Sequence, residues 1–146
     1  MTATAARRAV VTGVGVVAPG GVTRDEFWAT ITAGRSATRR ITFFDPAPFR
    51  SQVAAECDFD PVAAGLTPRE RRRADRYVQF ALAASLEALA DSGLELTDDL
   101  RQRTGVVLGS AVGGTMALEQ EYVVASDSGA EWLGDPDCTT PFLYQA

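Results

Sequence analysis

Few side chains in this sequence could take part in covalent chemistry, and the two cysteines are the first candidates. A nucleophilic cysteine needs a helix N-terminus or a neighbouring cation to stabilise its thiolate. Glu56 and Asp58 instead flank Cys57, and Cys138 follows Asp137. Because acidic neighbours disfavour a thiolate, we interpret Cys57 and Cys138 as free, unreactive thiols without a disulfide framework.

The residue types that are absent narrow the chemistry further. The chain has no histidine and no lysine, so all 14 cationic side chains are arginines. A Ser-His-Asp or Cys-His site, a lysine Schiff base and a lysine-bearing phosphate loop therefore cannot be assembled within it. Zinc would have two distant cysteines and carboxylates, without a ligand spacing that indicates a site. We predict no catalytic residue, no metal and no bound cofactor in this chain.

Two glycine-rich turns resemble nucleotide-binding motifs. Residues 13–18 match G-x-G-x-x-A after a predicted strand, but a proline and two glycines follow, so no helix begins before Thr23. No acidic residue occupies the place where a ribose ligand is expected, near position 33. We interpret this turn as close backbone packing. The turn at 109–115 lacks a phosphate loop's lysine, and we expect it near a ligand cavity.

Five arginines cluster where a helix is predicted to begin. Cations at a helix N-terminus oppose its dipole, so helix stability does not explain them. Two interpretations stay open: a solvated face with internal salt bridges, or a docking patch for an acidic partner. The chain's net charge of −5 argues against nucleic-acid binding. The cluster consists of Arg69, Arg71, Arg72, Arg73 and Arg76.

Strands and helices are predicted to alternate, which indicates an α/β fold. Capping-box patterns at Thr23 and Thr67 predict two helix starts, and Gly34 and Gly93 the corresponding ends. The expected strands are 9–14, 51–56 and 104–110, and the expected helices are 23–33, 68–92, 116–126 and one that opens near 141. Three strands are few for such a sheet. We therefore predict one domain over 1–146 that is incomplete at its C-terminus.

The composition is that of a globular domain. The chain is 46% hydrophobic and 23% charged, which excludes a largely disordered chain. No apolar run is long enough to cross a membrane, and the N-terminus lacks a signal-peptide core. We expect a cytoplasmic protein.

Several stretches of the chain resemble β-ketoacyl-[acyl carrier protein] synthases. They are most similar to the ketosynthase α subunit of type II aromatic polyketide synthases of actinomycetes, including the spore-pigment type. The resemblance covers nearly the whole chain in the family's order. The stretches that carry it are residues 8–21, 27–28, 34–45, 49–56, 58–61, 75–84, 91–94 and 105–114.

This resemblance implies a thiolase-like fold, in which two similar halves each contain a mixed sheet flanked by helices. The chain would be most of the N-terminal half. The family transfers an acyl group from acyl carrier protein to a cysteine, decarboxylates malonyl-carrier protein, and joins the two by Claisen condensation. The substrate arrives on phosphopantetheine. The family's cysteine and two histidines would lie beyond this chain, and Cys138 does not match the cysteine's context, so we expect the isolated chain to be inactive.

Only a few site residues carry over by position. Residues 67–73 align with the basic helix start that contacts the carrier protein, which makes Arg69, Arg72 and Arg73 the docking candidates. Val112 aligns with a residue that lines the acyl pocket near the dimer interface. The implied partners are acyl carrier protein and either a chain-length factor, in a heterodimer, or the remaining ketosynthase half. The alternative is a short non-catalytic ketosynthase-like subunit that binds carrier protein or a partner subunit.

Overall fold

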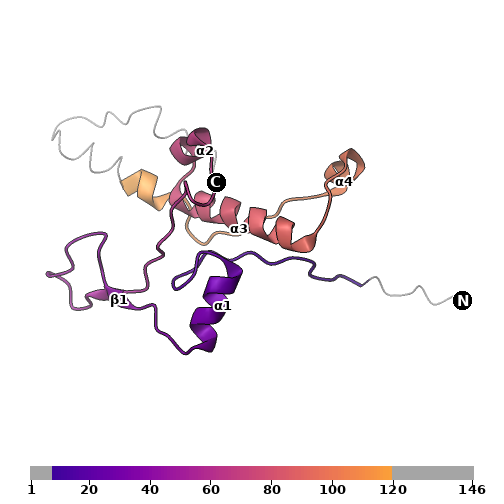
Figure 1. Ribbon diagram of the computed structural model, residues 1–146. Coiled ribbons are helices and arrows are strands. Elements are labelled where there is room, and N and C mark those ends of the chain that lie inside the picture. The colour runs from indigo at the N-terminus through magenta and orange to yellow at the C-terminus, as the bar shows by residue number, and fades with distance from the viewer. Residues whose placement is uncertain (1–7, 120–146) are drawn as a thin grey trace, which may run out of the picture.

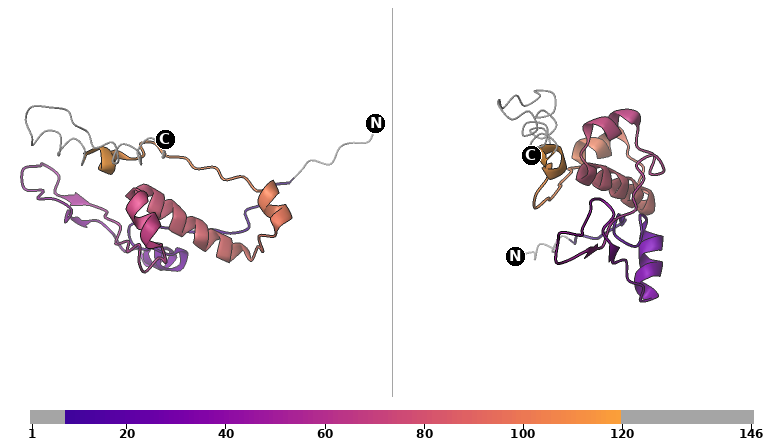
Figure 2. Two further views of the ribbon diagram at one scale, coloured as in Figure 1. Left: turned by 90° about the horizontal axis from the view of Figure 1, so that it is seen from above. Right: turned by 90° about the vertical axis from the view of Figure 1, so that its left-hand side faces the viewer.

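The structure, a computed structural model, describes residues 8–119 of the chain (Figure 1). The long helix α3 runs through the middle of the described part, with α2 at one end and α4 at the other (Figures 1 and 2). α1 lies to one side of α3, and the small hairpin extends past the end of α3 at which α2 lies. No helix among the described residues is both long and apolar enough to cross a bilayer. The elements are α1 (Arg24–Thr32), β1 (Arg39–Arg40), β2 (Val53–Ala54), α2 (Pro68–Arg73), α3 (Arg76–Ser92) and α4 (Asp98–Arg103).

The caps predicted for α1 form with one change of partner. The Thr23 hydroxyl accepts from the Glu26 N–H at 3.3 Å. The Glu26 carboxylate accepts from the N–H of Val22, 3.0 Å away, rather than from that of Thr23. Gly34 follows the helix with a φ of 64°, in the left-handed region that glycine adopts most easily. The predicted start and end of this helix are confirmed.

The predicted single helix over 68–92 is wrong, because the structure divides it into α2 and α3. α2 begins with the expected capping box between Thr67 and Glu70. It ends at Arg73, and Ala74 is extended, with φ −100° and ψ 127°. Asp75 then caps α3 through the N–H of Arg76. A carboxylate that accepts a bond at a helix N-terminus supplies the physical reason for a second start.

The buried strands predicted at 9–14 and 104–110 are also wrong for the described residues. Both segments are extended, but neither has a ladder partner there. Val11 is 85% exposed and Val107 is 96% exposed. A strand forms only where a neighbouring strand takes its backbone hydrogen bonds, and valine-rich sequence cannot supply that neighbour by itself.

The short strand expected within 51–56 is confirmed as β2. It pairs antiparallel with β1, with Arg39 opposite Ala54 and Arg40 opposite Val53. The segment that contains β1 was not among the expected strands. Among residues 8–119, the two strands of this hairpin form the only sheet.

The first glycine-rich turn is confirmed as a place of close backbone packing. A Cβ on Gly13 would lie 2.0 Å from the Ala88 carbonyl oxygen, and a Cβ on Gly15 would lie 1.9 Å from that of Ala84. Both distances are far inside van der Waals contact. The segment therefore lies directly on α3, where small side chains leave room for it.

Buried residues connect the segment between β2 and α2 to α3. Phe59 and Leu66 are the buried apolar side chains of the described part. The Phe59 ring meets the Phe80 ring edge to face, with centroids 5.0 Å apart, a favoured aromatic geometry.

The last predicted helices fall mostly outside the described residues. Residues 115–119 are helical, which confirms the start of the helix expected from 116. The rest of that helix, Cys138 and the helix expected near 141 lie outside the described part.

Candidate functional site

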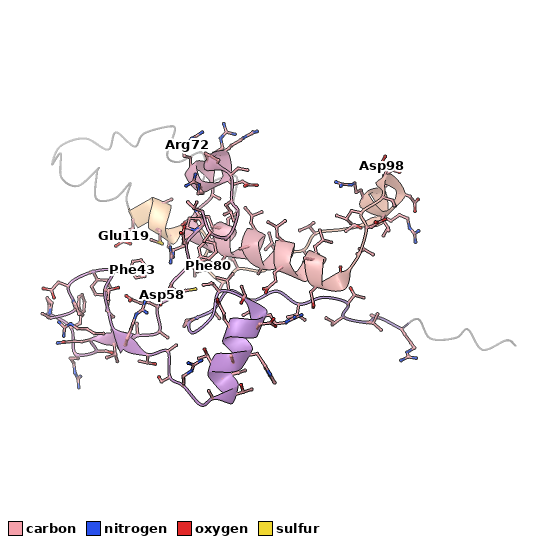
Figure 3. The ribbon with its side chains drawn as sticks, viewed as in Figure 1. Phe43, Asp58, Arg72, Phe80, Asp98 and Glu119 are labelled. Carbon is pink, nitrogen blue, oxygen red and sulfur yellow. The ribbon has the colours of Figure 1, made fainter. Side chains whose placement is uncertain are left out.

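The three predicted docking arginines lie on the exposed surface of α2. Arg69, Arg72 and Arg73 are exposed, whereas Arg71 is half-buried and its Nε is buried without a partner among the described residues. Positions three and four apart share one side of a helix, so the three form a single cationic face. In Figure 3, Arg72 lies at the outer edge of the molecule, on the side away from α1.

The acidic residue of α2 does not neutralise this face. One oxygen of the Glu70 carboxylate accepts both the N–H and the hydroxyl of Thr67, each at 2.7 Å. These bonds hold the pKa of Glu70 below its usual value, so the carboxylate stays ionised while it serves the cap. Within residues 8–119, no ion pair involves Arg69 or Arg72. Of the two open interpretations, internal salt bridges are thus not found for these two arginines.

A hollow of about 530 Å³ lies beside the cationic face. Arg69 and Arg73 line it together with the apolar side chains of Ala74 and Val78. Such a surface suits a partner that brings carboxylates or phosphate together with a small apolar group. The residues around the hollow are Thr67, Arg69, Glu70, Arg73, Ala74 and Val78.

The junction between α2 and α3, which we call the elbow (residues 74–75), is held by side chains of α3. The Gln79 amide donates to the Ala74 carbonyl at 2.9 Å and to the Arg71 carbonyl at 3.3 Å. Sequence reasoning missed Gln79, because its role exists only where the helix breaks. The available signal was Asp75, an N-cap type of residue in the middle of a predicted helix.

Arg76 has a structural role that separates it from the rest of the cluster. Its guanidinium lies over the Phe43 ring at 5.3 Å and over the Phe80 ring at 5.0 Å. Nη2 also donates to the Cys57 carbonyl at 2.9 Å. Arg76 therefore ties the hairpin loop and the chain before α2 to the start of α3.

Cys57 is a half-buried free thiol, as predicted. Burial is the main cause that raises its pKa, and the nearby Arg76 only partly opposes that effect. A raised pKa keeps the thiol protonated and disfavours nucleophilic chemistry. Among residues 8–119, no group of three or more histidine, cysteine, aspartate or glutamate side chains could hold a metal ion.

Val112 lies in the turn before the helical residues 115–119 and is 70% exposed. Its neighbour Gly113 packs on Tyr77, since a Cβ on Gly113 would lie 2.7 Å from Cζ of that ring. The structure therefore brings this turn and the docking candidates to the same end of α3 (Figure 2). The acyl-pocket role of Val112 stays a prediction.

Comparison with known proteins gives consistent matches. A family model described as "Beta-ketoacyl synthase, N-terminal domain" matches residues 6–140. The actinorhodin polyketide putative beta-ketoacyl synthase 1 of Streptomyces coelicolor is 59% identical over 129 residues, which are 88% of this chain and 28% of that protein. The tetracenomycin polyketide synthase ketoacyl synthase alpha subunit of Streptomyces glaucescens is 49% identical over 144 residues, or 99% and 34% of the two chains.

A solved structure, the ishigamide ketosynthase/chain length factor, matches with a TM-score of 0.70 and 30% identity. The match covers 89% of this chain and 32% of that one. The chain thus spans about a third of the length of the relatives that it matches.

Proposed function

The chain belongs to the beta-ketoacyl synthase family, whose fold is thiolase-like, and we propose that it is the N-terminal part of a polyketide ketosynthase α subunit. Identities of 59% and 49% to named polyketide ketosynthases, over almost all of the chain, support this proposal. The reaction would be elongation of a polyketide by decarboxylative Claisen condensation of malonyl-acyl carrier protein, in the cytoplasm.

In this proposal, the catalytic residues of the reaction lie outside residues 1–146. An acyl group moves from carrier-protein thioester to a cysteine, and the carrier thiol leaves. Malonyl-carrier protein then loses carbon dioxide, and the resulting carbanion attacks the acyl-cysteine thioester, so that a carbon–carbon bond forms and the cysteine thiolate leaves. Two histidines assist. The chain described here brings no cysteine or histidine for these steps and no bound cofactor, because the substrate would arrive on phosphopantetheine.

The part of the function that this chain would carry is recognition of the carrier protein. One observation carries the proposal: Arg69, Arg72 and Arg73 form an exposed cationic face, while Glu70 is committed to the helix cap. Arginine binds carboxylates and phosphates with two parallel hydrogen bonds. That chemistry fits an acidic carrier helix with a phosphopantetheine group.

Two further assignments complete the proposal. A chain-length factor would be the partner subunit, supported by the similarity to a protein named as a ketosynthase/chain length factor. Val112 would line the acyl pocket near that dimer interface. Its place next to the glycine that packs on Tyr77, at the α2 end of α3, puts it near the proposed docking face and supports this assignment.

Charge reversal on α2 tests the docking proposal. We expect Arg72→Glu with Arg73→Glu, in the native polypeptide that contains this chain, to weaken acyl-carrier-protein binding about 10-fold to 100-fold at low salt. The matched control is Arg35→Glu with Arg50→Glu, which changes the net charge equally at two exposed sites away from α2. Unchanged affinity in the α2 variant, or an equal loss in the control, would contradict the proposal.

The mass of the native protein tests the wider assignment. The chain has a mass of 15.5 kDa. A larger mass, with a cysteine and two histidines in the additional sequence, is the expected result. A lone 15.5 kDa species that binds carrier protein would favour the alternative, a short non-catalytic subunit.

A further inference from the structure

We propose that Gln79 is a positioning residue for carrier-protein docking: its side-chain amide holds α2 at the angle that turns the cationic face outward. This inference rests on the proposed docking function. It concerns a residue that lies outside the cationic face and that contacts the elbow rather than the partner.

The Asp75 cap explains where α3 starts but does not by itself explain why the preceding helix stops. Residues 73–76 contain neither proline nor glycine, the residues that usually interrupt a helix. Ala74 has the highest helix propensity of all residue types, yet it is extended. A contact from elsewhere in the fold must therefore offset the helical hydrogen bonds that are lost here.

Gln79 supplies that contact. In a continuous helix, the carbonyls of Arg71 and Ala74 would accept from N–H groups four residues later. At the elbow, the amide of Gln79 donates to both carbonyls instead. Asp75 satisfies the start of α3 through the N–H of Arg76. One half-buried side chain on α3 thus binds the end of α2 and the elbow together.

The direction of the cationic face depends on this break. Arg69, Arg72 and Arg73 precede Arg76 by seven, four and three positions. In an unbroken helix, these separations place all of them in one row with Arg76, and Phe80 extends that row. Arg76 and Phe80 face the packed side, against Phe43 and Phe59. A continuous helix would therefore direct the docking arginines toward the hairpin and not toward a partner.

The variant that tests this inference is Gln79→Met, measured in the native polypeptide with any subunit that accompanies it. Methionine keeps the unbranched shape and the helix propensity of glutamine but cannot donate a hydrogen bond. We expect KM for acyl-carrier protein to rise about fivefold to tenfold. We expect kcat, and the rate with a small pantetheine thioester that needs no carrier docking, to stay within about twofold of the unmodified protein.

Two other variants make the result specific. Gln79→Glu keeps the side-chain shape and places a carboxylate against the two carbonyls, so KM should rise at least as much. Gln102→Leu, at an exposed position of α4, is the control and should leave KM unchanged. The reversal of Arg72 and Arg73 is measured in the same assay.

Each outcome decides the matter. An unchanged KM in Gln79→Met, with a loss in the arginine variant, overturns the role of Gln79 and leaves the docking proposal intact. An equal loss with the small thioester assigns Gln79 to general stability and also overturns the inference. No loss in either variant contradicts docking at α2 and the inference together.

Discussion

Residues 9–17 and residues 104–110 have the same kind of sequence, valine-rich and followed or interrupted by glycines, yet their surroundings differ. The first segment is fastened to α3. The N–H of Val14 donates to Asp91 at 3.0 Å, and that of Val16 donates to Glu87 at 2.8 Å. The second segment is exposed along its whole length, and among residues 8–119 no atom lies within 4 Å of a Cβ on Gly105 or Gly109.

The difference between the two segments lies in what α3 presents to them. Glu87 accepts from Val16 and also from the N–H of Arg24 at 2.8 Å, so it joins the first segment to the start of α1. Arg24 in turn pairs with Asp91. Carboxylates on a helix can therefore satisfy extended backbone that has no strand beside it. Residues 104–110 have no such carboxylate acceptor among the described residues, and their extended backbone is exposed.

The largest effect on stability is expected from adding a methyl group where the first segment contacts α3. Gly15→Ala would bring a Cβ to within 1.9 Å of the Ala84 carbonyl oxygen, and neither backbone can give way cheaply. We expect a loss of about 3 kcal/mol in the free energy of unfolding, measured by urea denaturation. Gly105→Ala in the open segment is the control and should be neutral. Equal losses of stability at Gly15 and Gly105 would contradict the proposed difference between the attached and the exposed segment.

Removal of the Glu87 carboxylate should have the next largest effect. Glu87→Ala leaves the N–H groups of Val16 and Arg24 without their acceptor. We expect the free energy of unfolding to fall by about 2 kcal/mol, with Glu95→Ala, at an exposed position, as control. A value within the control's error would show that water replaces this acceptor.

Acid should weaken the same attachment. Bonds from Arg24 and from the N–H of Val14 lower the pKa of Asp91 in the folded protein. A lowered folded pKa stabilises the fold above the carboxyl's usual pKa, and that contribution disappears as the pH falls through the folded value. We expect Asp91→Asn to flatten the acid side of the stability curve. A variant curve parallel to that of the unmodified protein would argue against this linkage.

The smallest effect is expected in the open segment. Val107 is 96% exposed, so Val107→Thr should change the free energy of unfolding by less than about 0.5 kcal/mol. The measurement is again urea denaturation. A loss above about 1 kcal/mol would show that the native polypeptide covers this segment with residues outside 8–119.

The sequence predicted those features that short-range chemistry determines. The caps at Thr23 and Thr67 need only neighbours three or four residues away, and both formed where expected. The close packing at Gly13 and Gly15 was also predictable, because glycines in one segment and alanines in another point to a narrow contact. The elbow was not predictable from propensity, since it depends on a side chain five residues after Ala74.

The candidate site was likewise predictable only in part. The choice of Arg69, Arg72 and Arg73 came from resemblance, and their exposure agrees with it. Nothing in the sequence distinguished Arg76 from them, because its contacts with Phe43 and the Cys57 carbonyl bring together residues far apart in the chain. Strand pairing failed for a related reason, since a valine run does not specify its neighbour.

The contacts of Arg76 and the attachment of residues 14–16 to α3 rest on different chemistry. The contacts of Arg76 with two aromatic rings and a carbonyl involve no carboxylate. The attachment of residues 14–16 depends on the carboxylates of Asp91 and Glu87. Acidification should therefore weaken the attachment of the N-terminal segment through Asp91, whereas the contacts of Arg76 with the two rings and the carbonyl do not depend on a carboxylate.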